Sequence, residues 1–209
     1  MSPFALTTDI GAYFREAVEA AIKARRVEIA SPTQAYLVGI LEEQAKPGTE
    51  QPGQPFTLLF EAALEAPTLS DRFERLRVLG DGLLYRLGFF GDHFEARGVD
   101  ADYLIALGSR AYQTAGSMLA GASTRALDAA TNTSVAELDV FGELARKFGT
   151  MVGVLNEVAD ATTAANASSQ AGVVRLYERW LRTGSDSLAE ALQSHGLTQP
   201  KRGQGGPAS

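Results

Sequence analysis

The stretch from residue 70 to residue 98, SDRFERLRVLGDGLLYRLGFFGDHFEARG, constrains the fold more than any other part of the chain. At about 100° per residue, its large apolar side chains gather on one face of a helix. That face consists of Phe73, Leu76, Leu83, Leu84, Leu87 and Phe94. Gly80, Gly91 and Gly98 fall together beside it, which predicts close packing of another helix at Gly91 and a left-handed stop at Gly98.

The other side of this predicted helix does not have the charged residues of a solvated face. Tyr85, Phe89, Asp92 and His93 lie there together with Gly82. A surface helix buries one stripe and exposes a polar one. The pattern therefore predicts a central helix that is packed in front and partly covered behind.

Apolar residues at helical spacing continue through most of the chain. Predicted helices cover residues 9–26, 31–44, 56–66, 70–98, 101–121, 134–159, 169–183 and 187–195. No stretch shows the sustained alternation that is typical of a strand. The sequence thus predicts an all-α fold, a single-domain helical bundle of about seven to eight helices that is irregular rather than four-helix. Its centre is a glycine-rich helix hairpin formed by residues 70–98 and 101–121.

Residues with capping side chains mark the starts of several helices. The predicted starts are Ser31 before Pro32, Thr68 or Ser70, Asp100, Ser168 or Ser169, and the capping boxes Ser134–Glu137 and Ser187–Glu190. From Leu138 to Ala159 apolar residues recur at spacings of three and four, which predicts one long helix. A kink is expected in it near Gly149 or Gly153.

The boundaries of the predicted domain follow from two segments rich in proline, glycine and polar residues. Residues 45–55, AKPGTEQPGQP, are predicted to form a surface loop. Too few residues precede this loop to build an independent core, so residues 1–197 are predicted to form one helical domain. Residues 198–209, TQPKRGQGGPAS, are predicted to be a disordered tail.

Composition and charge exclude several classes of function. The net charge is −6, so no overall positive field would attract nucleic acid. The chain has no cysteine, which excludes disulfides, thiolate metal sites and cysteine nucleophiles. No apolar run approaches the roughly 18 residues of a membrane span. A cytoplasmic protein without membrane insertion is expected.

The two histidines do not form a recognisable catalytic or metal-binding motif. Neither His93 nor His195 belongs to a Glu-x-x-His pair or a His-Glu-x-x-His sequence, so no metal or other cofactor is predicted. His195 stands beside a helix-ending glycine, where a cation interacts well with the helix dipole. Asp92, Asp100 and Asp102 could gather for a hard cation, but helix capping accounts for Asp100.

The back of the central helix is the place where a ligand would best fit. The candidate ligand-binding residues are Tyr85, Phe89, Asp92, His93, Tyr103, Arg110 and Tyr112. The same side chains could equally form a second packing face whose polar tips bond to neighbouring helices. The sequence leaves both interpretations open, and no catalytic residue is predicted.

Residues 80–112 resemble a segment found in uncharacterised bacterial all-helical proteins of about 200 residues. The resemblance lies in Phe89-Phe90, in the turn from Val99 to Tyr103, and in the segment from Gly108 to Tyr112. It implies a bacterial, soluble helical domain and no particular activity.

Two functions follow as hypotheses. The first is a non-enzymatic cytoplasmic protein-interaction or regulatory protein, with a protein partner or self-association. The alternative is a small-molecule-binding helical protein or enzyme with a pocket along the back of the helix at 70–98. The absence of a catalytic motif favours a protein that is not an enzyme.

Overall fold

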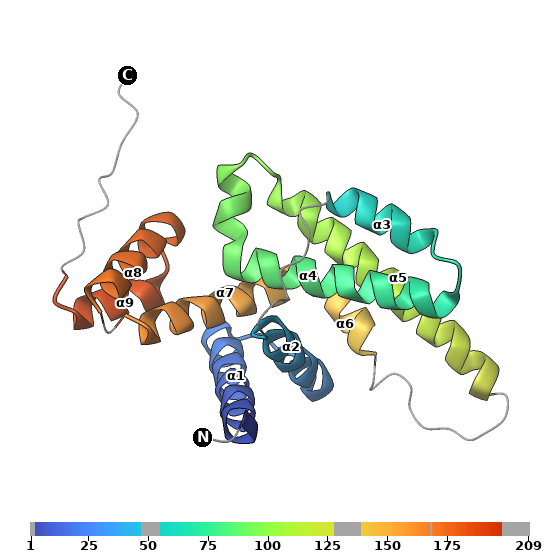
Figure 1. Cartoon of the computed structure of the whole chain (residues 1–209), viewed down its shortest axis with the longest axis horizontal. Coiled ribbons are helices and arrows are strands. Elements are labelled where there is room, and N and C mark those ends of the chain that lie inside the picture. Colours follow the sequence, from blue (N-terminus) through green and yellow to red (C-terminus); the bar gives the residue numbers. More distant parts are fainter. Residues whose placement is uncertain (1–2, 47–54, 128–138, 168, 198–209) are drawn as a thin grey trace. The chain divides into compact units, whose positions relative to one another are not determined.

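A computed structural model describes residues 3–46, 55–127, 139–167 and 169–197. All secondary structure in these residues is helical, which confirms the all-α prediction (Figure 1). The nine helices of the described residues are α1 (Pro3–Arg25), α2 (Ser31–Gln44), α3 (Phe56–Leu64), α4 (Leu69–Ala96), α5 (Ala101–Leu127), α6 (Val140–Arg146), α7 (Phe148–Ala165), α8 (Gln170–Thr183) and α9 (Asp186–Ser194). None of them is long and apolar enough to cross a membrane.

The helices group into two compact units, residues 1–158 and 159–209, and the division falls within α7. The single domain predicted over residues 1–197 stays a prediction. The predicted loop at 45–55 and the predicted tail at 198–209 fall largely outside the described residues.

Helix α4 is the buried centre of the first unit, as its sequence predicts. Residues 79–84 are all buried, although they point in every direction around the helix. Helix α5 lies alongside α4 (Figure 1). Gly98, at φ 71°, ends α4, and the Val99 amide donates to the Phe94 carbonyl at 2.9 Å. The Asp100 carboxylate then accepts the Asp102 amide at 2.9 Å, so the predicted hairpin, stop and cap are confirmed.

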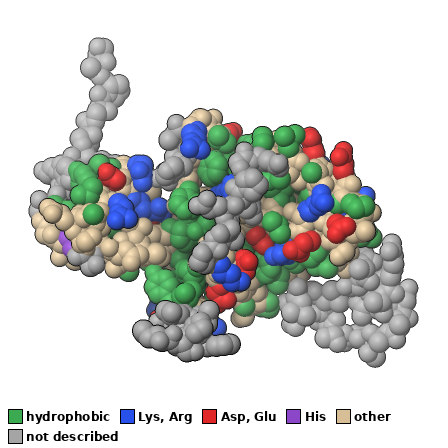
Figure 2. All heavy atoms as spheres, in the orientation of Figure 1, with side chains coloured by type: hydrophobic (Ala, Val, Ile, Leu, Met, Phe, Trp, Pro, Cys, Tyr) green, Lys and Arg blue, Asp and Glu red, His purple; other side chains and the backbone are tan. Residues whose placement is uncertain are grey.

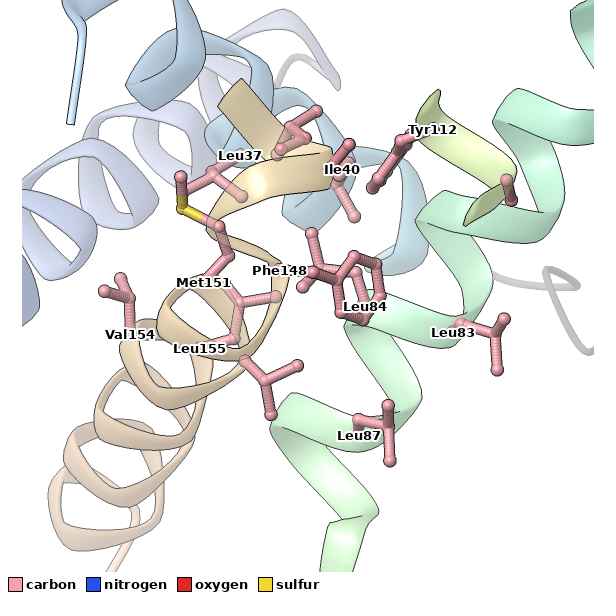
Figure 3. Close-up of a cluster of buried hydrophobic side chains, with 14 of the residues drawn as sticks. Leu37, Ile40, Leu83, Leu84, Leu87, Tyr112, Phe148, Met151, Val154 and Leu155 are labelled. Atoms are coloured by element: carbon pink, nitrogen blue, oxygen red, sulfur yellow. The ribbon is translucent and has the colours of Figure 1, made fainter. Parts of the chain in front are cut away.

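Helix α7 supplies the other half of the core. The Phe148 ring of α7 lies beside Leu84 of α4, and Met151 points toward Leu37 of α2 (Figure 3). Two glycines make this packing close. A Cβ added at Gly88 of α4 would overlap the Leu155 Cβ, and one added at Gly108 of α5 would overlap the Phe148 ring.

The long helix predicted from residue 134 to residue 159 is two helices in the structure. Lys147, at φ −110° and ψ 23°, separates α6 from α7. The break therefore lies ahead of Gly149 and Gly153, where a kink was expected. The capping box at Ser134 lies outside the described residues, and Asp139 caps α6 by accepting the Gly142 amide at 2.8 Å.

Three of the predicted capping residues are confirmed, Asp100 among them, and two are wrong. Thr68 accepts the Asp71 amide at 3.0 Å, and Ser169 accepts the Gly172 amide at 3.1 Å. Ser31 is not a cap, because Ala30 occupies the N-cap position of α2. Ser187 is not a cap either, because it lies inside α9, whose N-cap position is occupied by Ser185 two residues earlier.

The prediction that another helix packs closely on Gly91 is wrong. A Cβ added there would have nothing within 4 Å. The cause is a kink at Phe90, at φ −134° and ψ 24°, which interrupts the regular rotation of α4. Residues after the kink no longer continue the face of Gly80, which packs on Tyr112.

A buried carboxylate from α6 takes the place of the missing serine cap on α2. Glu143 is 9 % exposed and accepts the Ala30 amide at 3.2 Å and the Lys147 ammonium at 2.9 Å. Burial by itself raises the pKa of Glu143, but hydrogen bonds from Thr33, Lys147 and Ala30 outweigh it and bring the pKa below its ordinary value. A negative charge at a helix N-terminus is also favoured by the helix dipole.

Glu143→Gln is therefore expected to lower the free energy of unfolding by about 1–2 kcal/mol at pH 7. Because the folded-state pKa of Glu143 is lowered, its contribution is complete above the ordinary value near 4.5 and is lost as pH falls through the folded pKa. The difference between wild type and variant in urea unfolding should shrink as pH falls below that value. A difference that stays constant down to acidic pH would contradict this role.

The second unit has its own small apolar cluster. Leu176 of α8 and Leu188 and Leu192 of α9 are buried in it together with Ala167. A buried ion pair also lies in this unit, in which Arg179 Nε donates to Asp160 Oδ1 at 2.5 Å. Ser169 begins α8, and Gly184, at φ 64°, ends it.

Candidate ligand-binding site

Asp81 is the centre of a hydrogen-bonded network that joins three helices of the first unit. It lies in the middle of α4, between Gly80 and Gly82, and is 8 % exposed. Its Oδ1 accepts the Tyr36 hydroxyl of α2 at 2.8 Å and the Tyr112 hydroxyl of α5 at 2.7 Å. One carboxylate oxygen therefore ties α2 and α5 to α4.

The second oxygen of Asp81 is paired with an arginine one turn earlier in α4. Arg77 Nη1 donates to Asp81 Oδ2 at 2.8 Å, and Arg77 Nη2 contacts Glu74 Oε1 at 2.5 Å. The Arg77 side chain is about one third exposed, whereas that of Glu74 is more than half exposed. The network thus leads from the buried Asp81 to the surface.

Burial controls the protonation of this network. It raises the pKa of the Asp81 carboxyl, against the lowering effect of the bonds from Tyr112, Tyr36 and Arg77. Burial and the neighbouring Asp81 charge also raise the pKa of Tyr36 and of Tyr112. Both tyrosines therefore stay protonated and remain hydrogen-bond donors at ordinary pH.

Aromatic packing holds the two tyrosine rings in place. The Tyr112 ring is fully buried and lies against Gly80, where an added Cβ would come within 2.7 Å of its Cε1. The Tyr36 ring meets Phe141 edge-on, with ring centroids 5.4 Å apart. Tyr112 packs on Phe141 and Phe148 as well. The glycine before Asp81 is thus what lets Tyr112 reach the carboxylate.

A cleft of about 630 Å³ opens over this network between α2 and α4. Its walls combine apolar, small and charged side chains. They are Ala35, Tyr36, Gly39, Ile40, Glu43 and Gln44 from α2 and Glu74, Arg77, Val78 and Asp81 from α4. Acidic and basic side chains lie close together on the face of the first unit in view, with apolar side chains between them (Figure 2).

Gly39 keeps the α2 side of this cleft open. A Cβ added at Gly39 would have nothing within 4 Å, and its φ is not positive. Neither packing nor backbone conformation therefore requires glycine there, although glycine in a helix interior costs about 1 kcal/mol relative to alanine. Gly39 also lines a second cleft of about 390 Å³ on the other side of α2, toward α1.

The residues singled out from the sequence are only partly brought together. Tyr85 and Phe89 stack on the back of α4 with ring centroids 4.8 Å apart. Tyr112 belongs instead to the Asp81 network. Tyr103 and Arg110 are exposed on α5. A ligand-binding role for these residues stays a prediction.

The side chains of Asp92 and His93 lie outside the described residues, although their backbone is part of α4. Among the described residues no group of three or more His, Cys, Asp or Glu is placed to hold a metal ion.

The residues that sequence analysis missed are Asp81, Tyr36 and Arg77. The Gly-Asp-Gly sequence at 80–82 indicates close packing, and the structure places Gly80 against Tyr112. The feature of the sequence that could have revealed this site is the position of Asp81. An aspartate within the apolar run of a central helix, four residues after an arginine, needs buried partners.

Comparison with known proteins gives no relative whose site could be compared with this one. No family model, no curated protein and no solved structure matches the chain.

Proposed function

We propose that this chain is a non-enzymatic binding protein and that its ligand occupies the cleft between α2 and α4. The observation that carries the proposal is a cleft with a rigid polar floor. Asp81 and its partners fix the floor from three helices, so the cleft needs no reorganisation to receive a ligand. Its volume of about 630 Å³ falls within the range of about 300–1,000 Å³ for small-molecule sites.

Binding is favoured over catalysis because the polar groups at the floor are already engaged. Both oxygens of Asp81 accept hydrogen bonds, and the raised pKa of Tyr36 keeps its hydroxyl protonated. A general base needs a lone pair that can reach the substrate's proton, and a nucleophile needs an adjacent base or a lowered pKa. The network instead resembles a structural support beneath a binding surface.

Gly39 provides the test. Gly39→Phe should place a ring in the open cleft and abolish binding of any ligand that enters between α2 and α4. A screen of metabolite-like compounds by thermal shift, followed by native mass spectrometry, would identify the ligand. The expected result is that this ligand no longer binds the Gly39→Phe variant, while the far-UV circular dichroism spectrum of the variant matches that of wild type. A ligand that binds wild type and Gly39→Phe equally would exclude this cleft.

Gly39→Ala is the matched control. The added methyl group meets no neighbour and improves helix propensity, so it should raise the free energy of unfolding by about 0.5–1 kcal/mol. Because a single methyl leaves most of the cleft open, ligand binding should persist. Urea unfolding of the free protein measures the first effect, and the second follows from the same ligand titration. A destabilised Gly39→Ala would mean that α2 is more crowded than the structure shows.

A second candidate function is the protein interaction that the sequence favours. The specific observation is an aromatic cluster at the kink of α4, where Phe90 is 45 % exposed while it packs edge-on against Tyr85 at 5.9 Å. Aromatic side chains are enriched at protein–protein interfaces relative to the rest of the surface. The proposed partner is a second copy of the chain. A concentration-dependent dimer in sedimentation that Phe90→Glu dissociates would support it, and a monomer at all concentrations would refute it.

A further inference from the structure

Each charged side chain in the described lining of the α2–α4 cleft already has a partner of opposite charge. Arg77 Nε and Nη2 donate to the two carboxylate oxygens of Glu74, at 3.0 Å and 2.5 Å. Arg77 Nη1 donates to Asp81 Oδ2 at 2.8 Å, while Asp81 Oδ1 accepts two tyrosine hydroxyls. Glu43 pairs with Lys46 at the rim. The charges of the cleft are thus balanced before any ligand binds.

A charged ligand would have to break one of these pairs. An anion would draw Arg77 away from Asp81 and leave a buried carboxylate without its ion pair, which is costly. A cation would find the oxygens of Glu74 and Asp81 already accepting hydrogen bonds. Glu43 is 60 % exposed, and an ion pair at such an exposed position contributes little. A neutral ligand leaves all of these pairs intact.

Gln44 differs from these residues, because its polar side chain is neutral and unpaired. It lines the cleft as the last residue of α2 and is partly buried. Its carboxamide makes no hydrogen bond among the residues that the structure describes. A carboxamide presents donors and an acceptor side by side. A second carboxamide can therefore pair with both groups of Gln44 at once.

The surface that shares the cleft with Gln44 is apolar and open. Val78 of α4 is 38 % exposed, and a Cβ added at Gly39 of α2 would have nothing within 4 Å. Ala35 and Ile40 line the same cleft. Gln44 lies five residues after Gly39, which is about 7.5 Å along a helix. An aliphatic chain of that length would remove this apolar surface from water while its polar end reaches Gln44.

We infer that the ligand of this cleft is an uncharged compound with an aliphatic chain that ends in a carboxamide. The inference rests on the proposed binding function and adds the chemical class of the ligand. The carboxamide pairs with Gln44, and the chain packs on Val78 and over Gly39. A free amide and the glutamine side chain of a peptide both present this chemistry.

The experiment compares probes that have the same length but different charge. Hexanamide, hexanoate and hexylammonium are titrated into the full chain at pH 7 and physiological salt, and binding is followed by NMR chemical shifts. N-acetylglutamine methylamide is the peptide form of the amide. The test variant is Gln44→Met, which keeps the length of the side chain and removes the carboxamide. The matched control is Gln193→Met, at an exposed position near the end of α9.

The expected result is that hexanamide binds at least about fivefold more tightly than hexanoate and hexylammonium, the effect of about one hydrogen bond. Gln44→Met should weaken the binding of hexanamide by a similar factor, and Gln193→Met should bind it like wild type. Gly39→Phe should abolish it. The amide that binds more tightly, hexanamide or N-acetylglutamine methylamide, identifies the source as a free amide or a peptide side chain.

A charged probe that binds as tightly as hexanamide would overturn the inference. Equal binding of hexanamide to wild type and Gln44→Met would overturn it as well. The same holds if neither amide binds at concentrations up to about 20 mM, where the binding of so small a ligand should be detected.

The inference and the proposed function fail separately. If hexanoate or hexylammonium binds wild type more tightly than hexanamide but does not bind Gly39→Phe, the neutral amide is excluded and the cleft remains the site. Hexanamide that binds wild type and Gly39→Phe equally would overturn both.

Discussion

Asp81→Ala is expected to lower the free energy of unfolding by about 3 kcal/mol, the lower end of the cost of breaking a buried ion pair. The loss has two parts. Tyr112 is fully buried, and its hydroxyl would have no acceptor in place of Asp81 Oδ1. Arg77 would lose its buried partner but keep Glu74, which limits the penalty. Urea unfolding at pH 7 measures the effect.

Two milder variants separate these parts. Asp81→Asn retains an oxygen that can accept both tyrosines but presents an amide group to Arg77, so a loss of about 1–2 kcal/mol is expected. Tyr112→Phe removes one hydroxyl and should cost about 1 kcal/mol. The double variant Asp81→Ala/Tyr112→Phe should lose less free energy of unfolding than the two single variants added together, because both changes remove the hydrogen bond between Tyr112 and Asp81. An Asp81→Ala protein as stable as wild type would contradict the network.

The pH dependence of Asp81 is opposite in sign to that of Glu143. Its folded-state pKa is raised above the ordinary 3.8, so the folded protein binds the proton more tightly than the unfolded chain. Its contribution to stability therefore increases as pH falls through the folded pKa toward 3.8, and decreases as pH rises. Comparing wild type with Asp81→Asn across this range isolates the contribution from that of the other carboxylates.

The helices were predictable because apolar residues recur along the sequence with the period of a helix, about 3.6 residues. The stripe from Phe148 to Ala159 is an example, since Phe148, Val152, Leu155 and Ala159 are all buried in the structure. Stops at Gly98 and Gly184 were predictable for the same local reason, since each adopts a positive φ. The break at Lys147 was not, because the apolar spacing continues through it without a change.

The candidate site was not predictable from local patterns. Asp81 meets Tyr36 from 45 positions away and Tyr112 from 31 positions away. The register of three packed helices decides these meetings, and periodicity within one helix contains no information about it. The cap of α2 has the same origin, since Glu143 is 113 positions from Ala30. A helical wheel drawn through Gly91 fails in turn because it assumes a straight helix.

Gly88→Ala is expected to destabilise the protein by about 2–3 kcal/mol, in the range of core overpacking. The new methyl group would overlap the Cβ of Leu155, an atom that is fixed to the α7 backbone and cannot rotate away. Helices α4 and α7 must then separate in a fully buried region, since Leu87 is 2 % and Leu155 0 % exposed. This cost exceeds the gain of about 1 kcal/mol in helix propensity. Thermal and urea unfolding of the variant measure the net change in the free energy of unfolding.

Gly91→Ala is the control in the same helix, three residues later. It makes the same chemical change where the added Cβ has nothing within 4 Å, so only the propensity gain of about 0.5–1 kcal/mol should remain. Opposite signs for the two variants would establish that α4 packs closely on α7 at Gly88 and is open at Gly91, after the kink at Phe90. A loss of stability in Gly91→Ala would instead place a neighbour on that face, and equal gains in both variants would exclude the close approach at Leu155.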